Sequence, residues 1–85
     1  MLDDRVISND RYNDLVDLFK KREFESLIKK IKCLEEDKFE DPFLLNLLGA
    51  TYLKLNDEKN AKIYFSHAIA IEPNYRDAII NLGNL

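Results

Sequence analysis

Apolar side chains recur every three or four positions through most of the chain, which is the spacing of one face of an α-helix. The pattern is clearest over 42–55. Its inward stripe consists of Leu44, Leu45, Leu48, Tyr52 and Leu55. Asp41 can accept hydrogen bonds from the free amides of the first turn, and Pro42 suits the first helical position. We therefore expect a helix over 42–55.

A second helix is expected over 58–71, after a short turn. Asn56 suits the left-handed conformation in which many helices end, and Asp57 can cap the next helix. Pro73 ends this segment. The residues on its apolar face are Ala61, Phe65, Ala68 and Ile69. Glycine and proline are scarce, and no segment alternates as a strand would, so the expected fold class is all-α.

Residues at fixed spacing within these two helices form a repeat motif. They are Leu45, Leu48, Gly49 and Tyr52, then Ala61 and Phe65, then Pro73. This motif resembles the tetratricopeptide repeat, a helix-turn-helix unit of about 34 residues, with Leu45 at the place of the family's Trp. One period later the chain has similar residues, namely Ile79, Leu82 and Gly83. The resemblance implies antiparallel A and B helices whose repeats stack as a right-handed superhelix.

The resemblance divides the chain, as a single domain over 1–85, into about two and a half repeats. These are a tail over 1–7, a degenerate repeat over 8–41, a complete repeat over 42–75, and the first helix of a truncated repeat over 76–85. Terminal repeats of such arrays are commonly atypical because one side faces water. The complete repeat is therefore the best guide to the register.

The first repeat departs from the motif. Arg11 and Asp14 fall at core positions if the period is kept. We expect an offset of one residue in this helix, together with a turn one residue shorter around Arg22. The apolar side chains that then face inward are Tyr12, Leu15 and Phe19.

Composition and charge argue against catalysis and against nucleic acid as a partner. The net charge is −3, from 13 basic and 16 acidic residues, and the lysines are interleaved with carboxylates. The chain has no Ser/His/Asp set and no glycine-rich phosphate loop. Cys33 and His67 lie one period apart, but two ligands are too few for a zinc site. We expect no enzyme activity, no cofactor and no metal.

The cellular setting is expected to be cytoplasmic. The chain has one cysteine, so it cannot form an internal disulfide. No apolar run reaches the roughly 18 residues of a spanning helix, and none follows the plan of a signal peptide. A soluble chain without a membrane partner is the expectation.

The resemblance implies a concave groove lined by the A helices. Its lining would be Tyr12, Asn13, Val16, Lys20, Phe43, Asn46, Leu47, Ala50, Lys54, Ile80, Asn81 and Asn84. Asparagine amides can hold the backbone of an extended peptide, while apolar neighbours take its side chains. One variety of the family binds chaperone carboxylates through basic residues, but this chain has Asp77 among those positions. The expected function is a protein–protein interaction module that binds a protein or peptide segment.

Three alternatives stay open at this stage. A neighbouring segment could fill the groove. The chain could form homo-oligomers through residues 75–85, where Ile79 and Leu82 would be uncovered. Thirdly, 42–49 and 81–85 resemble the N-terminal repeat region that precedes bacterial sulfotransferase or glycosyltransferase domains, which implies a non-catalytic arm of a larger transferase.

Overall fold

All regular structure in the described part of the chain is helical. The computed structural model describes residues 13–35 and 41–85. Its helical segments are residues 13–20, α2 (Phe24–Glu35), α3 (Pro42–Lys54), α4 (Glu58–Ile71) and α5 (Arg76–Gly83). The expected all-α class is confirmed over these residues. The expected tail over 1–7 and the groove residue Tyr12 lie outside them.

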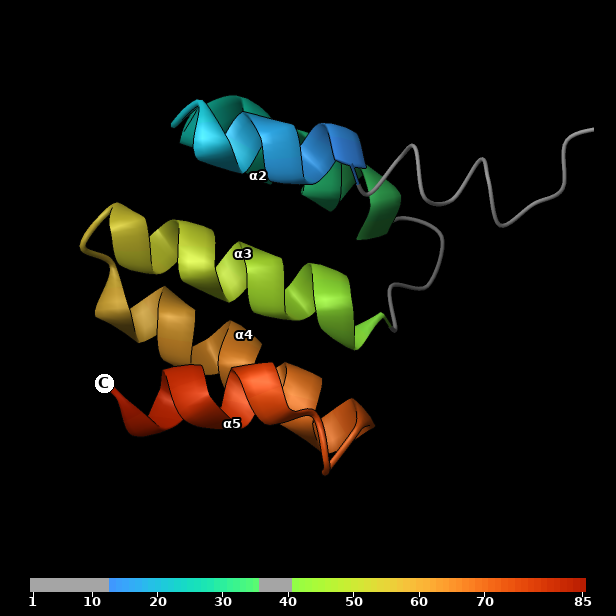
Figure 1. The fold of residues 1–85 in the computed structure, drawn as a ribbon, viewed down its shortest axis with the longest axis vertical. Coiled ribbons are helices and arrows are strands. Elements are labelled where there is room, and N and C mark those ends of the chain that lie inside the picture. The colour runs from blue at the N-terminus through green and yellow to red at the C-terminus, as the bar shows by residue number, and fades with distance from the viewer. Residues whose placement is uncertain (1–12, 36–40) are drawn as a thin grey trace, which may run out of the picture.

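The helices form two layers (Figure 1). Helix 13–20, α3 and α5 lie one below the other in a front layer, and α2 and α4 lie behind them. The two layers pack against each other: α2 contacts α3, and α4 contacts both α3 and α5. We call the outer surface of helix 13–20, α3 and α5 the front face. The described groove residues all belong to these three helices, except Asn84, which directly follows α5.

Local capping determines where α3 begins and ends. The backbone N–H of Phe43 donates to Oδ1 of Asp41 at 2.9 Å, and Pro42 is the first helical residue. Asn56 adopts the left-handed conformation, with a φ of 63°. The predicted helix over 42–55 is confirmed to within one residue. The placement of Leu55 in the inward stripe was wrong: Leu55 is the C-cap residue, beyond the last helical turn, and is 43% exposed.

The boundaries of α4 agree with the prediction. Oδ1 of Asp57 accepts from the backbone N–H of Asn60 at 3.2 Å, and Oδ2 accepts from Asn60 Nδ2 at 2.7 Å. These two bonds stabilise the carboxylate and lower the pKa of Asp57. The helix then runs over Glu58–Ile71. By contrast α5 begins after Tyr75, whose side chain makes no capping hydrogen bond.

The turn between α3 and α4 occurs in the same form one period earlier. Arg22 and Asn56, 34 positions apart, have φ angles of 64° and 63°. The matching backbone hydrogen bonds are Arg22 N to Phe19 O, Glu23 N to Leu18 O, Asn56 N to Leu53 O and Asp57 N to Tyr52 O. Each following helix starts two residues after the left-handed residue. The expectation of a shorter turn around Arg22 was therefore wrong.

The inward orientation of Leu15 and Phe19 is nevertheless confirmed. Leu15 is 2% exposed and Phe19 packs against the core, whereas Asp14 is exposed. The expected offset of one residue was wrong, because the backbone hydrogen bonds at the end of this helix keep the 34-residue period. Asp14 is exposed although Leu48, one period later, is fully buried. Leu15 lies one period before Gly49, and Ile31 lies one period before Phe65. Helix 13–20 and α2 thus combine a leucine with an isoleucine at these positions. Helices α3 and α4 combine a glycine with the larger phenylalanine.

The core contains two apolar clusters, and Ala61 and Phe65 are fully buried as well. The larger contains Leu15, Leu27, Ile31, Leu44, Leu47 and Leu48, and the smaller contains Leu45, Ala68 and Ala78. Tyr64 packs against both and stacks on Tyr52, with ring centroids 5.5 Å apart and planes at 4°. Thr51 is fully buried, and its hydroxyl donates to the carbonyl oxygen of Leu47 at 2.7 Å. The core is thus continuous from α2 to α5.

Candidate functional site

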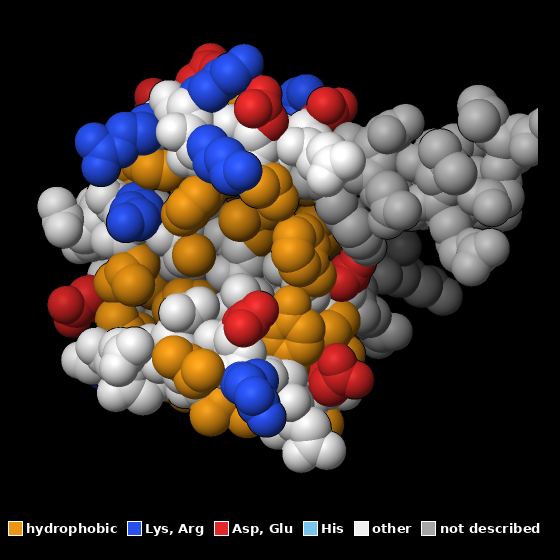
Figure 2. Space-filling model, viewed as in Figure 1, with side chains coloured by type: hydrophobic (Ala, Val, Ile, Leu, Met, Phe, Trp, Pro, Cys, Tyr) orange, Lys and Arg blue, Asp and Glu red, His pale blue; other side chains and the backbone are white. Residues whose placement is uncertain are grey.

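Apolar side chains gather on the front face. In Figure 2, which has the orientation of Figure 1, they cover the middle of this face, between charged side chains. Helix α3 carries apolar residues on two sides: one side packs against α2 and α4, and the other carries the half-buried Phe43 and Ala50. A soluble helix normally carries one apolar stripe, so a second apolar surface suggests a contact site.

An asparagine pair joins α3 and α5 on this face. Nδ2 of Asn81 donates to Oδ1 of Asn46 at 3.0 Å, and both side chains are partly buried. The bond uses one hydrogen of Asn81 and the carbonyl oxygen of Asn46. Nδ2 of Asn46 and Oδ1 of Asn81 therefore remain as a donor and an acceptor. The structure brings together two residues that the sequence placed in the groove separately.

The predicted apolar lining is divided between surface and core. Ile80 is 51% exposed, and Phe43 is half-buried against the larger core cluster. Val16 and Ala50 are also half-buried. Leu47 is only 9% exposed and belongs to the core itself, so its side chain contributes little to the surface. Phe43 and Ile80 are therefore the main apolar contacts that this face offers.

The polar residues predicted for the groove lie at its edges. Asn13, Lys20, Lys54 and Asn84 are all exposed. Lys20 and Lys54 are one period apart, and each is the last residue of its helical segment. They are therefore equivalent positions of helix 13–20 and α3. Both stand at the carboxyl ends of front-layer helices.

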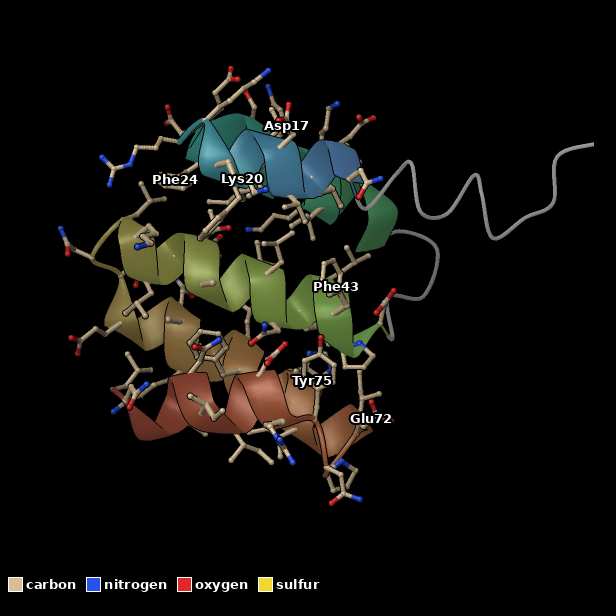
Figure 3. All side chains as sticks on the ribbon, in the orientation of Figure 1. Asp17, Lys20, Phe24, Phe43, Glu72 and Tyr75 are labelled. Carbon is tan, nitrogen blue, oxygen red and sulfur yellow. The ribbon has the colours of Figure 1, made fainter. Side chains whose placement is uncertain are left out.

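Sequence reasoning missed Tyr75 as part of this surface. Figure 3 shows Tyr75 at the same end of the molecule as Phe43. The phenol is half-buried against the smaller core cluster. Burial raises the pKa of Tyr75, and the negative charges of Asp77, Asp41 and Glu72 raise it further. The sequence does contain a signal: Tyr75 lies one period after Asp41, at an N-cap position, where tyrosine is an unusual residue.

The remaining features of the described residues concern metal binding, the membrane and a pocket. No group of three or more His, Cys, Asp or Glu side chains there could hold a metal ion, and Cys33 is exposed. None of the described helices has the length and apolar character needed to cross a bilayer. A shallow pocket of about 370 Å³ lies away from the asparagine pair. It is lined by Arg22, Glu23, Phe24, Glu25, Ser26 and Leu55.

Comparison with known proteins gives this chain no assignment. No protein-family model, curated protein or solved structure matches it. Its function therefore has to be inferred from the asparagine pair, the apolar side chains and the charges of the front face.

Proposed function

We propose that the chain is a tetratricopeptide-like array of about two and a half repeats, stacked as a right-handed superhelix. The support is internal. The turn at Arg22 has the same backbone hydrogen bonds as the turn at Asn56. Equivalent back-layer positions are also fully buried in both repeats. These are Leu27 and Ala61, then Ile31 and Phe65. In such an array the front layer consists of the A helices.

The function of this array, in our proposal, is to bind an extended protein or peptide segment across the front face. The observation that carries this proposal is the hydrogen bond between Asn46 and Asn81. Every residue of an extended peptide presents a backbone N–H and a C=O. The pair offers one acceptor and one donor that its own bond leaves available, so it can pair with both groups of a peptide.

The mutual bond also favours binding entropically. Each asparagine is already held by the other, so less side-chain freedom is lost when a peptide arrives. Phe43 and Ile80 lie on the same two helices as the pair and can accept apolar side chains of the segment. This combination of backbone pairing and apolar contacts is typical of extended peptide recognition. No catalytic step is part of the proposal.

The test uses random peptides displayed on phage, selected on the purified protein and then synthesised with a fluorescent label. Asn46→Ala and Asn81→Ala should each weaken the selected peptides by about three- to tenfold, because one hydrogen bond is lost. Asn74→Ala is the matched control, since Asn74 is an exposed asparagine in the turn before α5. Helicity should stay unchanged in all three variants. Peptides that bind all variants equally would contradict the proposal.

Self-association through α5 is a second candidate, favoured by a specific difference between equivalent positions. Leu45 is fully buried, whereas Ile79, one period later, is 45% exposed. A side chain added at Gly49 would meet Phe65, whereas nothing lies within 4 Å of one added at Gly83. The side of α5 that corresponds to the covered side of α3 thus carries apolar surface that a second copy could bury.

Molar mass measured by light scattering, over a range of protein concentrations, separates the two candidates. Self-association predicts a mass that rises toward the dimer. Gly83→Leu should then restore the monomer, because the new side chain occupies the place where the second copy approaches. A constant monomer mass at every concentration would exclude this candidate and leave peptide binding unaffected.

A further inference from the structure

Three carboxylates and two lysines lie at opposite ends of the front-layer helices, and Arg76, the exposed first residue of α5, adds one cation to the end that carries the carboxylates. Asp41, Glu72 and Asp77 lie where α3 and α5 begin, and we call them the acidic edge. Lys20 and Lys54, where helix 13–20 and α3 end, form the basic edge. Figure 3 shows Glu72, Tyr75 and Phe43 toward one end of the molecule, with Lys20 away from them. A bound segment therefore meets opposite charges at its two sides.

An aromatic surface lies within the acidic edge. Tyr75 is half-buried and packs against the cluster of Leu45, Ala68 and Ala78. The charges of all three carboxylates act on its phenol. Phe43 contributes a second half-buried ring at this end of the face. An aromatic face beside carboxylates attracts a cation by two independent effects, the ring quadrupole and the Coulomb field.

Helix stability does not account for this arrangement. Carboxylates at Asp41 and Asp77 favour the amino ends of their helices, as is common. Glu72, however, is the C-cap residue of α4, where the helix dipole disfavours a negative charge. Tyr75 occupies an N-cap position without providing a cap. Glu72 and Tyr75 are thus both unfavourable residue types for their helix-end positions, and they lie three residues apart. Such departures are more typical of binding surfaces than of structural positions.

We propose that the front face binds a segment that carries a lysine or arginine among apolar residues, with the cationic group against Tyr75 between Glu72 and Asp77. This inference rests on the proposed peptide-binding function and names its partner class. Both carboxylates are exposed, so they can reach a ligand. The lysines of the basic edge repel a cation at the other side, and thereby select one orientation of the segment. The overall net charge of −3 also favours a basic partner.

The same phage selection provides the test, with two variants of equal net charge. Glu72→Gln/Asp77→Asn removes two charges from the acidic edge. Glu25→Gln/Glu58→Gln removes two charges from the first turns of α2 and α4, in the back layer. All four side chains are exposed, so both proteins should fold. Labelled peptides selected on the unmodified protein are titrated against each variant at low and high salt.

Selected peptides should share a lysine or arginine beside apolar residues. Glu72→Gln/Asp77→Asn should weaken them by about five- to tenfold at low salt, and Glu25→Gln/Glu58→Gln by less than about twofold. Peptides without a basic residue, or equal losses in both variants, would overturn this inference while leaving peptide binding intact. If no peptide is enriched above the Asn46→Ala protein, the proposed function itself fails, and the inference fails with it.

Discussion

Gly49 and Phe65 fit together where α3 packs against α4: a Cβ added at Gly49 would lie 2.6 Å from Cε1 of Phe65. Phe65 is fully buried, so its ring has little room to move away. One period earlier the same two positions hold Leu15 and Ile31, both in the core. The volume that a glycine leaves in one helix pair is taken by the phenylalanine, and in the other pair two branched aliphatic residues share it.

The two glycines of the chain should respond differently to the same substitution. Gly49→Ala should lower the free energy of unfolding by about 1 to 3 kcal/mol, because the new methyl group overlaps the ring of Phe65. Gly83→Ala, the matched control one period later, should leave it unchanged or raise it slightly, since nothing lies within 4 Å. Urea unfolding followed by circular dichroism measures both. Equal effects would contradict the helix packing described above.

The compensation between side-chain sizes predicts coupling between two substitutions. Gly49→Leu alone should be strongly destabilising, and Phe65→Ile alone should leave a cavity. The double variant reproduces the Leu15 and Ile31 combination and should be more stable than the sum of the single effects, by about 1 kcal/mol or more. A double-mutant cycle from urea unfolding gives this value. A coupling energy of zero would show that the two positions do not share one space.

The cap of α4 predicts a pH dependence of stability. Asn60 donates two hydrogen bonds to the Asp57 carboxylate, and the pKa of Asp57 is lowered from 3.8. Because the folded-state pKa is the lower one, this stabilisation is present above the unfolded pKa and is lost as the pH falls through the folded pKa. Asp57→Ala should therefore lower the thermal midpoint near neutral pH.

The same comparison in acid supplies the check. The difference in midpoint between the unmodified protein and Asp57→Ala should be constant above about pH 5, and should shrink as the pH falls below about 4. Ser66→Ala, an exposed and uncharged position of the same helix, should show a difference from the unmodified protein that stays constant over the whole pH range. A gap for Asp57→Ala that widened in acid would contradict the assigned cap.

Much of the structure over 42–75 can be predicted from the sequence because its signals are local. Asp41, Asn56 and Asp57 occupy positions for which their side chains are well suited, and each determines a helix boundary. The turn at Arg22 is different. Arginine has no preference for the left-handed conformation, so nothing in its type indicates that it corresponds to Asn56. The correspondence is seen in the φ angle of Arg22 and in the backbone hydrogen bonds of the turn.

The site is less predictable because its contacts join residues distant in the chain. Asn46 and Asn81 were both placed in the groove by the resemblance, but their hydrogen bond depends on how α3 lies against α5. The surroundings of Tyr75 combine Asp41 with Glu72 and Asp77 in the same way. Leu47 is the opposite case. Its place in the repeat predicts a groove residue, but the packing of the helices makes it part of the core. Tertiary packing decides each of these cases.

The central claim is that a peptide binds across the front face at the asparagine pair. The most direct measurement is the nuclear magnetic resonance spectrum of the isotope-labelled protein, recorded while a selected peptide is added. The side-chain amide signals of Asn46 and Asn81 should shift most, together with backbone amide signals of α3 and α5. The side-chain amide signal of Asn60 in α4 should not shift. Shifts confined to α2 and α4, with both asparagine side chains unaffected, would contradict the claim.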